Sequence, residues 1–460
     1  NEFQSDGSNG FSILENVIDD TTTAYSQLWI PDCYDPRVKT PLIIFLHGGI
    51  STAEFVPKED LLKYSQENIL WEKLKDSNYI FLFPTGKMGL TWWEKDGMEN
   101  LTTQIRLLKQ EYNIDDNRIC MTGISDGGSG SYHFAMNKPD DFAAFLPMIG
   151  MISVGSLVNQ QPVFISNLQN RPIYATNTDK DGLYPAEQMR KLIALSQQAG
   201  SDILYKEFFG FGHEVSYLDK EVDFQIDYIE SRIRDPFPTN IYWETEDPYF
   251  GKCDWLEITG IDTNSISKSW QIFHNTKLLN TRLLFGFNND RKWEGEGVKV
   301  SMVSEDSAAE ECGLKIDDLI VALDDNEIKE ISELIELRDT TKKHGSKFSL
   351  TVLRNDEKIV LNGQFHEQKE YSAIFEKHNS GAVMANYFGN RFIIEASKVT
   401  SLSIYVHPQM VNFDNPVIIE IDGEVVFEQK VEFDRDFLIR NFIKNYDRKA
   451  LWCNKIDLKL

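Results

Sequence analysis

Hydrophobic positions follow two different patterns along this chain, and the pattern changes near residue 236. Before that point, short and mostly apolar runs alternate with longer helical stretches. A short apolar run bounded by turn residues is typical of a strand buried in a parallel sheet. The runs lie at 41–46, 118–122, 172–176 and 203–208, and the helical stretches at 128–136, 186–198 and 220–234. This alternation predicts an α/β architecture with a doubly wound, mostly parallel sheet over residues 1–236.

Beyond residue 236 the chain changes to short strands in which apolar and polar residues alternate. A linker is expected at residues 235–238, which read D-P-F-P, because proline disfavours helix in itself and in the residue before it. Alternating segments follow at 240–244, 254–258, 392–396 and 402–406, and residues 417–427 read as a hairpin with an Asp-Gly turn. The stretch at residues 238–275, which holds the first two of these segments, is too short to bury a core by itself. We therefore expect residues 237–276 and 366–460 to form one β-sandwich-like domain that carries an insertion.

The sequence G-I-S-D-G at residues 123–127 joins a predicted strand to a predicted helix. A serine on such a tight turn presents its hydroxyl above the end of the sheet, near the positive end of the helix. The motif alone occurs by chance, but its position between strand and helix indicates that Ser125 is a nucleophile. A Gly- and Ser-rich loop without chemistry is the weaker interpretation, because partners for the serine follow in the chain.

A serine nucleophile needs a base, and the base needs an acid that orients it. In α/β-hydrolases these residues come in the chain order Ser, acid, His. His213 follows a predicted strand and a Gly-flanked loop, and it is the expected base. Asp179 and Asp181 both lie in a polar turn after another strand. We prefer Asp181, because it comes just before the proline that opens the next helix, and Asp179 is the alternative. Asp181 should be buried and should accept the Nδ1–H of His213.

The apolar run at residues 41–46 ends in H-G-G. In hydrolases with this topology, the loop after the third strand donates one backbone N–H to the oxyanion, and the residue after the nucleophile donates another. These donors would be the amides of Gly49 and Asp126. His47 would orient the loop rather than act as a base.

Four motifs carry a resemblance to a known family. They are L-H-G-G at 46–49, G-I-S-D-G-G at 123–128, D-G-L-Y-P at 181–185 and G-F-G-H at 210–213. Residues 23–236 resemble α/β-hydrolases of the esterase group that includes polyhydroxybutyrate depolymerases and feruloyl or acetyl-xylan esterases. The resemblance implies ester hydrolysis through an acyl-enzyme without a cofactor. It assigns the catalytic roles to Ser125, Asp181 and His213 and the oxyanion roles to Gly49 and Asp126.

Trp92 and Trp93 resemble an aromatic feature near the active-site mouth of such enzymes. The resemblance therefore predicts that they contact substrate. The alternative is that they are two surface or core tryptophans.

The sequence Leu284-Phe285-Gly286-Phe287 matches a carboxylate-binding loop, and a long helix is predicted at 331–340. On these features, residues 277–365 resemble a PDZ domain of the kind attached to bacterial proteases. Asp317 stands where the family usually has glycine, so we expect that turn to be altered.

A working PDZ domain adds a peptide strand to its own edge and captures a terminal carboxylate. The resemblance therefore implies that a peptide or protein C-terminus is a partner. Charged residues at 288–292 follow the loop and would shorten the docking strand. A purely structural PDZ domain is the equal alternative.

Charge and cysteine content exclude several classes of protein. The 47 basic and 72 acidic residues give a net charge of -25, which argues against partners such as nucleic acids and anionic membranes. No apolar stretch approaches 20 residues, so no transmembrane segment is expected. The five cysteines contain no C-x-x-C pair, so neither a metal site nor a disulfide framework is expected. A single bridge is left open.

The first ten residues are polar and rich in Gly, Ser and Asn. We expect residues 1–15 to be a tether left after removal of a signal or lipoprotein leader. This predicts a bacterial protein that is periplasmic, secreted or on the cell surface.

Together these features predict a serine carboxylic ester hydrolase that acts on acyl esters of polysaccharides or on other small esters. A serine peptidase of the same fold is one alternative, because PDZ domains accompany proteases. A binding scaffold with a silent hydrolase core is another, but the intact Ser, Asp and His set argues against it.

Overall fold

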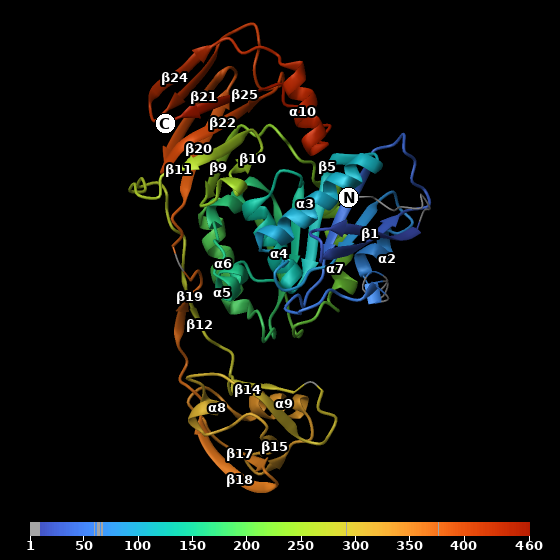
Figure 1. Ribbon diagram of the computed structural model, residues 1–460, viewed down its shortest axis with the longest axis vertical. Coiled ribbons are helices and arrows are strands. Elements are labelled where there is room, and N and C mark those ends of the chain that lie inside the picture. Colours follow the sequence, from blue (N-terminus) through green and yellow to red (C-terminus); the bar gives the residue numbers. More distant parts are fainter. Residues whose placement is uncertain (1–9, 59, 62–64, 66–67, 291, 376) are drawn as a thin grey trace. The chain divides into compact units, whose positions relative to one another are not determined.

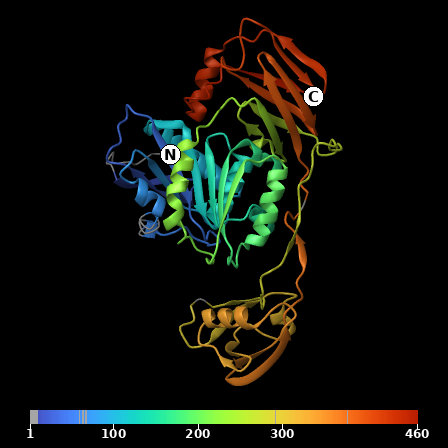
Figure 2. The ribbon, with the colours of Figure 1, turned by 180° about the vertical axis from the view of Figure 1, so that it is seen from behind.

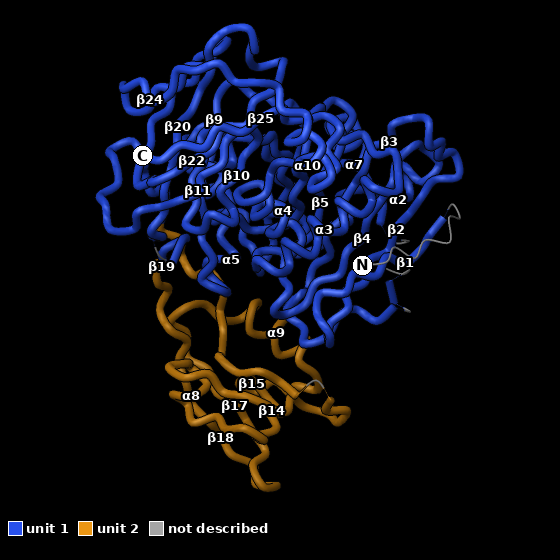
Figure 3. The backbone as a smooth tube through the Cα atoms, turned by 45° about the horizontal axis from the view of Figure 1, so that its top comes forward, with its two compact units in different colours: residues 1–276, 372–460 blue, residues 277–371 orange. Residues whose placement is uncertain are grey.

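The computed structural model describes residues 10–460 except for 59, 62–64, 66–67, 291 and 376. The chain divides into two compact units, shown in blue and orange in Figure 3. The larger unit comprises Asn1–Thr276 with Ser372–Leu460, and the smaller unit comprises Lys277–Tyr371. The smaller unit is thus inserted in the sequence of the larger one.

An eight-stranded sheet forms the centre of the first part of the larger unit (Figures 1 and 2). The strand order is β1-β2-β4-β3-β5-β6-β7-β8, and neighbours from β4 to β8 are parallel. The strands are β1 Gly10–Val17, β2 Thr23–Ile30, β3 Thr40–Leu46, β4 Ile80–Pro84, β5 Ile114–Ile124, β6 Ala144–Met148, β7 Ile173–Thr178 and β8 Ile203–Phe208. Every residue of β3, β4, β6 and β7 is buried, as expected for parallel strands covered on both faces. The predicted α/β-hydrolase fold is confirmed.

Helices flank this sheet in Figure 2. They are α2 Ile69–Leu74, α3 Lys95–Glu111, α4 Asp126–Asn137, α5 Val154–Asn159, α6 Ala186–Gln198 and α7 Leu218–Ser231, with a 3₁₀ turn, η1, at Ile165–Asn170. The bounds of α6 are those predicted from the sequence, whereas α4 begins two residues earlier than predicted, directly after Ser125.

The tether predicted for residues 1–15 is wrong where the structure describes it. Residues 1–9 lie outside the described residues, and residues 10–15 belong to β1, which pairs antiparallel with β2. The ring of Phe11 lies 4.7 Å from that of Trp29 and 5.0 Å from that of Trp71, and Leu14 is buried. These apolar contacts hold the segment on the sheet.

Two smaller sheets form a β-sandwich in the second part of the larger unit (Figure 1). Their orders are β10-β11-β22-β25 and β24-β23-β21-β20-β9. The strands are β9 Asn240–Thr245, β10 Lys252–Cys253, β11 Leu256–Ile261, β20 Gly381–Phe388, β21 Arg391–Ser397, β22 Val399–Val406, β23 Val417–Ile421, β24 Glu424–Gln429 and β25 Asn454–Lys459. A 3₁₀ turn, η2, lies at Pro248–Phe250, and helix α10, Arg435–Asn445, precedes β25.

The segments before and after the insertion share one hydrophobic core. β9 pairs with β20, and β11 pairs with β22. The indole of Trp255 lies 5.4 Å from the ring of Phe392, and both side chains are fully buried together with Trp243. Because each sheet takes strands from both segments, neither segment buries its apolar face alone. The β-sandwich-like fold predicted for these two segments is therefore present.

Buried ion pairs inside the larger unit join the β-sandwich to the part built on the eight-stranded sheet. That part, residues 10–236, is called the hydrolase part below. The guanidinium of Arg171 donates to the two carboxylate oxygens of Asp254 at 2.5 and 3.0 Å, and these side chains are 5% and 2% exposed. It also donates to the carbonyl of Phe142 at 2.9 Å. Arg234, at the end of the hydrolase part, pairs with Asp447 at 2.8 Å. Each charge depends on its partner from the other part, because a buried charge without a counterion is strongly unfavourable.

Replacing Arg171 by Ala is expected to lower the free energy of unfolding by about 3–5 kcal/mol, because Asp254 stays buried without its cation. Arg37→Ala is the matched control, since Arg37 pairs with Asp35 on the surface and its side chain is 87% exposed. This control is expected to leave stability almost unchanged. Urea unfolding of the full chain, followed by circular dichroism, measures both. Equal losses would contradict the role given to the buried pair.

The smaller unit is a mixed domain with a main sheet, a two-stranded pair and two helices among its described residues. Its main sheet has the order β13-β14-β15-β17-β18, with β16 paired to β15. The elements are β13 Phe287–Asn289, β14 Val298–Val303, α8 Ala308–Glu311, β15 Leu319–Leu323, β16 Asn326–Glu327, α9 Ile331–Thr341, β17 Lys347–Arg354 and β18 Glu357–Gln364. Phe285, Phe348 and Phe365 form its aromatic centre, with ring centroids 4.7 to 5.1 Å apart.

Two details of this unit bear on the sequence predictions. Asp317 adopts a φ of 70°, the left-handed conformation that glycine favours and that aspartate tolerates. The turn expected to be altered therefore has a glycine-like backbone. At the start of the unit, β12, Lys277–Leu279, pairs with β19, Glu370–Ser372, so that the two chain connections run side by side.

Candidate active site

Ser125 lies on a strained turn between β5 and α4. Its φ of 55° and ψ of -118° are unusual for a residue with a side chain, and such strain is concentrated at functional sites. A Cβ atom on Gly127 would lie 2.0 Å from the carbonyl oxygen of Leu46, so only glycine allows the helix to approach β3 this closely. The Ser125 N–H donates to the carbonyl of Met148 at 3.0 Å, which fixes the turn against β6.

The structure brings Ser125, His213 and Asp181 together. The Ser125 Oγ lies 2.7 Å from Nε2 of His213, and the His213 Nδ1 lies 2.8 Å from Oδ2 of Asp181. All three residues follow the carboxyl ends of parallel strands, where sites of open α/β sheets form. Because a carboxylate only accepts hydrogen bonds, Nδ1 carries the proton and Nε2 is free to accept one from the serine hydroxyl.

The two candidate acids lie in different environments. The Asp181 side chain is fully buried, and its Oδ1 accepts the backbone N–H groups of Leu183 and Tyr184, each at 2.8 Å. These bonds direct Oδ2 at the histidine. The Asp179 carboxylate instead accepts the N–H of Gly210 at 2.6 Å, in the loop that precedes His213. The geometry thus places Asp181, and not Asp179, beside the imidazole.

The loop after β3 is held by His47. Its Nδ1 lies 2.7 Å from the carbonyl of Gly48, and its Nε2 accepts the N–H of Gly86 at 3.1 Å. Nδ1 is therefore the protonated nitrogen of a neutral ring. Burial lowers the pKa of His47 and favours this neutral form. This geometry assigns His47 an orienting position and not that of a base.

Amides expected to bind the oxyanion lie next to the serine. A Cβ atom on Gly48 would be 2.9 Å from the Cβ of Ser125, so the loop passes directly beside the nucleophile. Gly49 follows with a φ of 69°. Asp126 is the first residue of α4, and the first amides of a helix have no partner within that helix. Gly49 and Asp126 thus lie on the two backbone segments that border Ser125, and their role as oxyanion donors stays a prediction.

The substrate contact expected for Trp92 and Trp93 is wrong. Their exposed fractions are 0% and 2%. The Trp92 indole N–H donates to the carbonyl of His47 at 3.0 Å, and that of Trp93 donates to Asn159 at 3.1 Å. Trp92 supports the loop after β3 from within the core, because its ring also packs edge-on against His47 at 5.5 Å.

Tyr184 is a residue of this site to which the sequence assigned no role. Its ring lies edge-on to the His213 imidazole at 5.5 Å, and its hydroxyl donates to Oδ1 of Asp126 at 3.0 Å. Its position in the D-G-L-Y-P motif was the only signal that could have marked it.

The carbonyls of the predicted carboxylate loop of the smaller unit accept backbone N–H groups from α8 and from the residue after β14. The Phe285 carbonyl accepts the N–H of Ala309 at 2.7 Å, and that of Gly286 accepts the N–H of Ser304 at 2.8 Å. Because C=O and N–H point in opposite directions across a trans peptide, the amides of Gly286 and Phe287 face away from these partners. β13 is only three residues long and has a register shift, so the edge strand is short, as the charged residues after it predicted.

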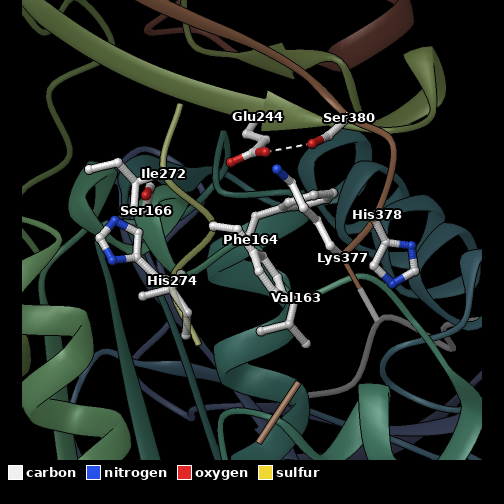
Figure 4. Close-up of a pocket in the computed structure, with 11 residues that line it drawn as sticks. Val163, Phe164, Ser166, Glu244, Ile272, His274, Lys377, His378 and Ser380 are labelled. Atoms are coloured by element: carbon white, nitrogen blue, oxygen red, sulfur yellow. Dashed lines mark hydrogen bonds between the residues drawn. The ribbon is translucent and has the colours of Figure 1, made fainter. Parts of the chain in front are cut away.

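A small pocket lies where the two chain connections of the insertion leave the larger unit (Figure 4). It has a volume of about 10 Å³, which holds about one water molecule. Glu244 accepts a hydrogen bond from Ser380 at 2.5 Å. His274 and His378 lie on opposite sides of the pocket. No predicted site residue lines this pocket, which is too small for a substrate.

The described part of the chain has no cluster suited to a metal ion, no disulfide and no membrane-spanning helix. Among these residues, no group of three His, Cys, Asp or Glu side chains is arranged to hold a metal ion. The bridge left open is not formed, since all five cysteines are free thiols: Cys33, Cys120, Cys253, Cys312 and Cys453. No helix within the described ranges has the length and apolar character needed to cross a bilayer.

The insertion can be compared with known domain families. Residues 260–362 match the family model of the PDZ domain. The chain contains a PDZ domain. The match begins at residue 260, before the first residue of the compact unit, Lys277. It ends at residue 362, shortly before the last residue of that unit, Tyr371.

Several known proteins resemble the hydrolase part. The curated relative "Bifunctional acetylxylan esterase/xylanase XynS20E" of Neocallimastix patriciarum is 31% identical over 144 residues, which is 30% of this chain and 19% of that protein. The chain thus matches about a fifth of the length of this relative. Among solved structures, a thermostable esterase has a TM-score of 0.41 at 24% identity, covering 49% of this chain and 63% of that one. A ferulic acid esterase has a TM-score of 0.39 at 14% identity, covering 48% and 98%.

Proposed function

We propose that this chain is a serine hydrolase that cleaves carboxylic esters through an acyl-enzyme. The observation that carries the proposal is the continuous hydrogen-bonded path from the Ser125 hydroxyl through both nitrogens of His213 to the buried Asp181 carboxylate. An isolated serine hydroxyl is a weak nucleophile, and this arrangement is the one that activates it.

In the proposed reaction, Ser125 Oγ attacks the ester carbonyl carbon while its proton passes to Nε2 of His213. The imidazolium that forms is stabilised by Asp181 across the 2.8 Å contact. The N–H groups of Gly49 and Asp126 bind the oxyanion of the tetrahedral intermediate. His213 then gives its proton to the departing alcohol oxygen. Water, deprotonated by the same nitrogen, attacks the acyl carbon and releases the acid and Ser125.

We propose an acyl ester on a polysaccharide as the substrate class, with acetyl the first acyl group to test. The support is the 31% identity to a protein named as an acetylxylan esterase and xylanase. Small soluble esters of the same acyl group form the second class.

The test combines a substrate panel with active-site labelling of the full chain. Acetyl, butyryl and feruloyl esters, acetylated xylan and a short chromogenic peptide are assayed together, and a fluorophosphonate probe is used to label the serine. Ester turnover with an adduct on Ser125 is expected. Peptide cleavage at a comparable rate would instead indicate a serine peptidase. Absence of both ester turnover and the adduct on Ser125 would indicate a binding scaffold without hydrolase activity.

For the PDZ domain we propose capture of a peptide C-terminus. The support is the orientation of the amides after Phe285 and Gly286, together with the exposure of Leu284 at 51% and of Ile335, on α9, at 41%. PDZ domains that capture such peptides bind the terminal carboxylate with backbone amides and bind the last side chain in a pocket.

Peptides with an apolar C-terminal residue are therefore expected to bind the full chain, and the same peptides with an amidated C-terminus are expected to bind more weakly by at least about tenfold. Calorimetric titration measures both. Equal binding of the two peptides would contradict carboxylate capture, and no binding of either would indicate that the domain has a structural role.

A further inference from the structure

The carboxylate of Asp126 connects three segments of the candidate active site. Its Oδ2 accepts the backbone N–H of Ile50 at 3.1 Å, at the end of the loop after β3. Its Oδ1 accepts the hydroxyl of Tyr184 at 3.0 Å, in the segment that follows Asp181. Asp126 itself begins the helix behind Ser125. One side chain thus joins the loop that carries Gly49, the serine turn and the acid-bearing segment.

Two hydrogen bonds hold the peptide units on either side of Gly49. The peptide unit before Gly49 is held through its carbonyl, that of Gly48, which accepts Nδ1–H of His47 at 2.7 Å. C=O and N–H of a trans peptide point in opposite directions, so this bond turns the Gly49 N–H away from His47. The peptide unit after Gly49 is held through its N–H, that of Ile50, by Asp126. Both peptide planes that meet at Gly49 are therefore fixed from outside.

Gly49 itself contributes little to this rigidity. It has a φ of 69°, and apart from Gly49 and its two chain neighbours no heavy atom of the described residues lies within 4 Å of the place that a Cβ would occupy. Glycine also has more conformational freedom than other residues. Without the bond from Ile50 to Asp126, the loop would keep its His47 anchor and lose the second one.

Tyr184 holds the carboxylate in this position. Burial and the neighbouring Asp126 raise the pKa of the Tyr184 hydroxyl above its usual range, so it stays protonated and donates. Its backbone N–H donates to Asp181 at 2.8 Å, which ties the same residue to the acid. Two donors on Asp126 also offset its negative charge, which would otherwise disfavour an oxyanion nearby.

We propose that the Asp126 side chain, held by Tyr184, is a positioning group that directs the Gly49 N–H at the developing oxyanion. The proposal rests on the ester hydrolase function proposed above. Asp126 then acts in two ways: its amide binds the oxyanion, and its carboxylate aligns the second donor. A carboxylate in the first turn of α4 also favours the helix electrostatically, so the test must separate alignment from helix stability.

Three variants and one control test the proposal. Asp126→Ala removes the bridge, Asp126→Asn keeps an acceptor for Ile50, and Tyr184→Phe keeps the ring beside His213 but removes the donor. Tyr34→Phe is the matched control, because the Tyr34 hydroxyl accepts the N–H of Asn113 at 2.9 Å. Both residues precede the amino ends of strands, β3 and β5, so this contact lies at the opposite end of the strands from Ser125. For each variant, kcat, KM and melting temperature are measured with a short p-nitrophenyl ester. Inhibition by a trifluoromethyl ketone, which forms a tetrahedral adduct on the serine, is measured as well.

Asp126→Ala is expected to lower kcat by about 10–100-fold and to weaken trifluoromethyl ketone binding by a similar factor, because a misplaced oxyanion donor acts only on the tetrahedral state. KM should change little. Tyr184→Phe is expected to show the same selective loss at about 3–10-fold. Asp126→Asn should recover most of both quantities, and Tyr34→Phe should behave as the unmodified chain.

Unchanged kcat and ketone affinity in Asp126→Ala would overturn the proposal, as would a fall in melting temperature without a selective loss of ketone binding. If Asp126→Ala does not fold, Tyr184→Phe decides by the same two quantities. An active enzyme that is labelled on Ser125 and is insensitive to these changes refutes the positioning role alone. Absence of ester turnover in the unmodified chain refutes the proposed function and this inference together.

Discussion

Replacing Ser125 by Ala is expected to lower kcat for a short p-nitrophenyl ester by about 10⁶-fold, since no other group in the triad can form the acyl-enzyme. The adduct with a fluorophosphonate probe should disappear at the same time. Melting temperature should change little, because the Ser125 N–H keeps its bond to Met148 and only one hydroxyl contact is lost.

Ser131→Ala is a matched control for this experiment. Ser131 lies on α4, the helix that begins directly after Ser125. Its hydroxyl donates to the carbonyl of Gly127 at 3.0 Å, a contact within the helix that alanine does not need. This variant should keep its activity and its adduct. Ester hydrolysis that survives in Ser125→Ala, or an adduct that is lost in both variants, would refute the assignment of Ser125 as the nucleophile.

Asp181→Asn is expected to lower kcat by about 10⁴-fold, as loss of the orienting charge does in Ser-His-Asp hydrolases. The reason is specific to the hydrogen bonds of this site. Because Leu183 and Tyr184 donate two N–H groups to Oδ1, the carbonyl oxygen of the asparagine would take that place. Its NH₂ group would then face Nδ1 of His213 and favour the tautomer with the proton on Nε2, which cannot accept the proton of Ser125.

Asp179→Asn separates the two candidate acids. An asparagine at this position keeps an acceptor for the Gly210 N–H, and it lies outside the path from the serine to the buried carboxylate. Its kcat is therefore expected to stay close to that of the unmodified chain. Comparable losses in the two variants, or the larger loss in Asp179→Asn, would show that the acid is assigned wrongly. Circular dichroism of both variants checks that they fold.

Local sequence was sufficient for features that depend on neighbouring residues. The serine turn was predictable because its glycines and its strand and helix are contiguous, and α6 follows directly from Pro185. The hairpin at β23 and β24 was predictable because Asp422 and Gly423 favour the positive φ values that such a turn needs, 55° and 87°.

Features that depend on distant partners were not predictable in this way. The inward orientation of Trp92 depends on the carbonyl of His47, which is 45 residues away in the sequence. The pair of Arg171 and Asp254 joins two folded parts across 83 residues, and no periodicity marks either residue. The prediction of a tether was wrong for a different reason. Only the first ten residues have a polar composition, and the apolar side chains of Phe11 and Leu14 that follow were the signal of a strand.

The pairing of β12 with β19 has a consequence for how such a chain evolves. Ala373 donates its N–H to Thr276 at 2.9 Å, and Asn280 donates to Lys369 at 2.9 Å, so the entry and the exit of the PDZ domain are neighbours. An insertion whose ends meet adds little loop-closure entropy to its host. Such a cassette can be gained, lost or exchanged between genes without shifting the register of the flanking strands. Natural selection can then alter the inserted domain independently of the part that carries Ser125.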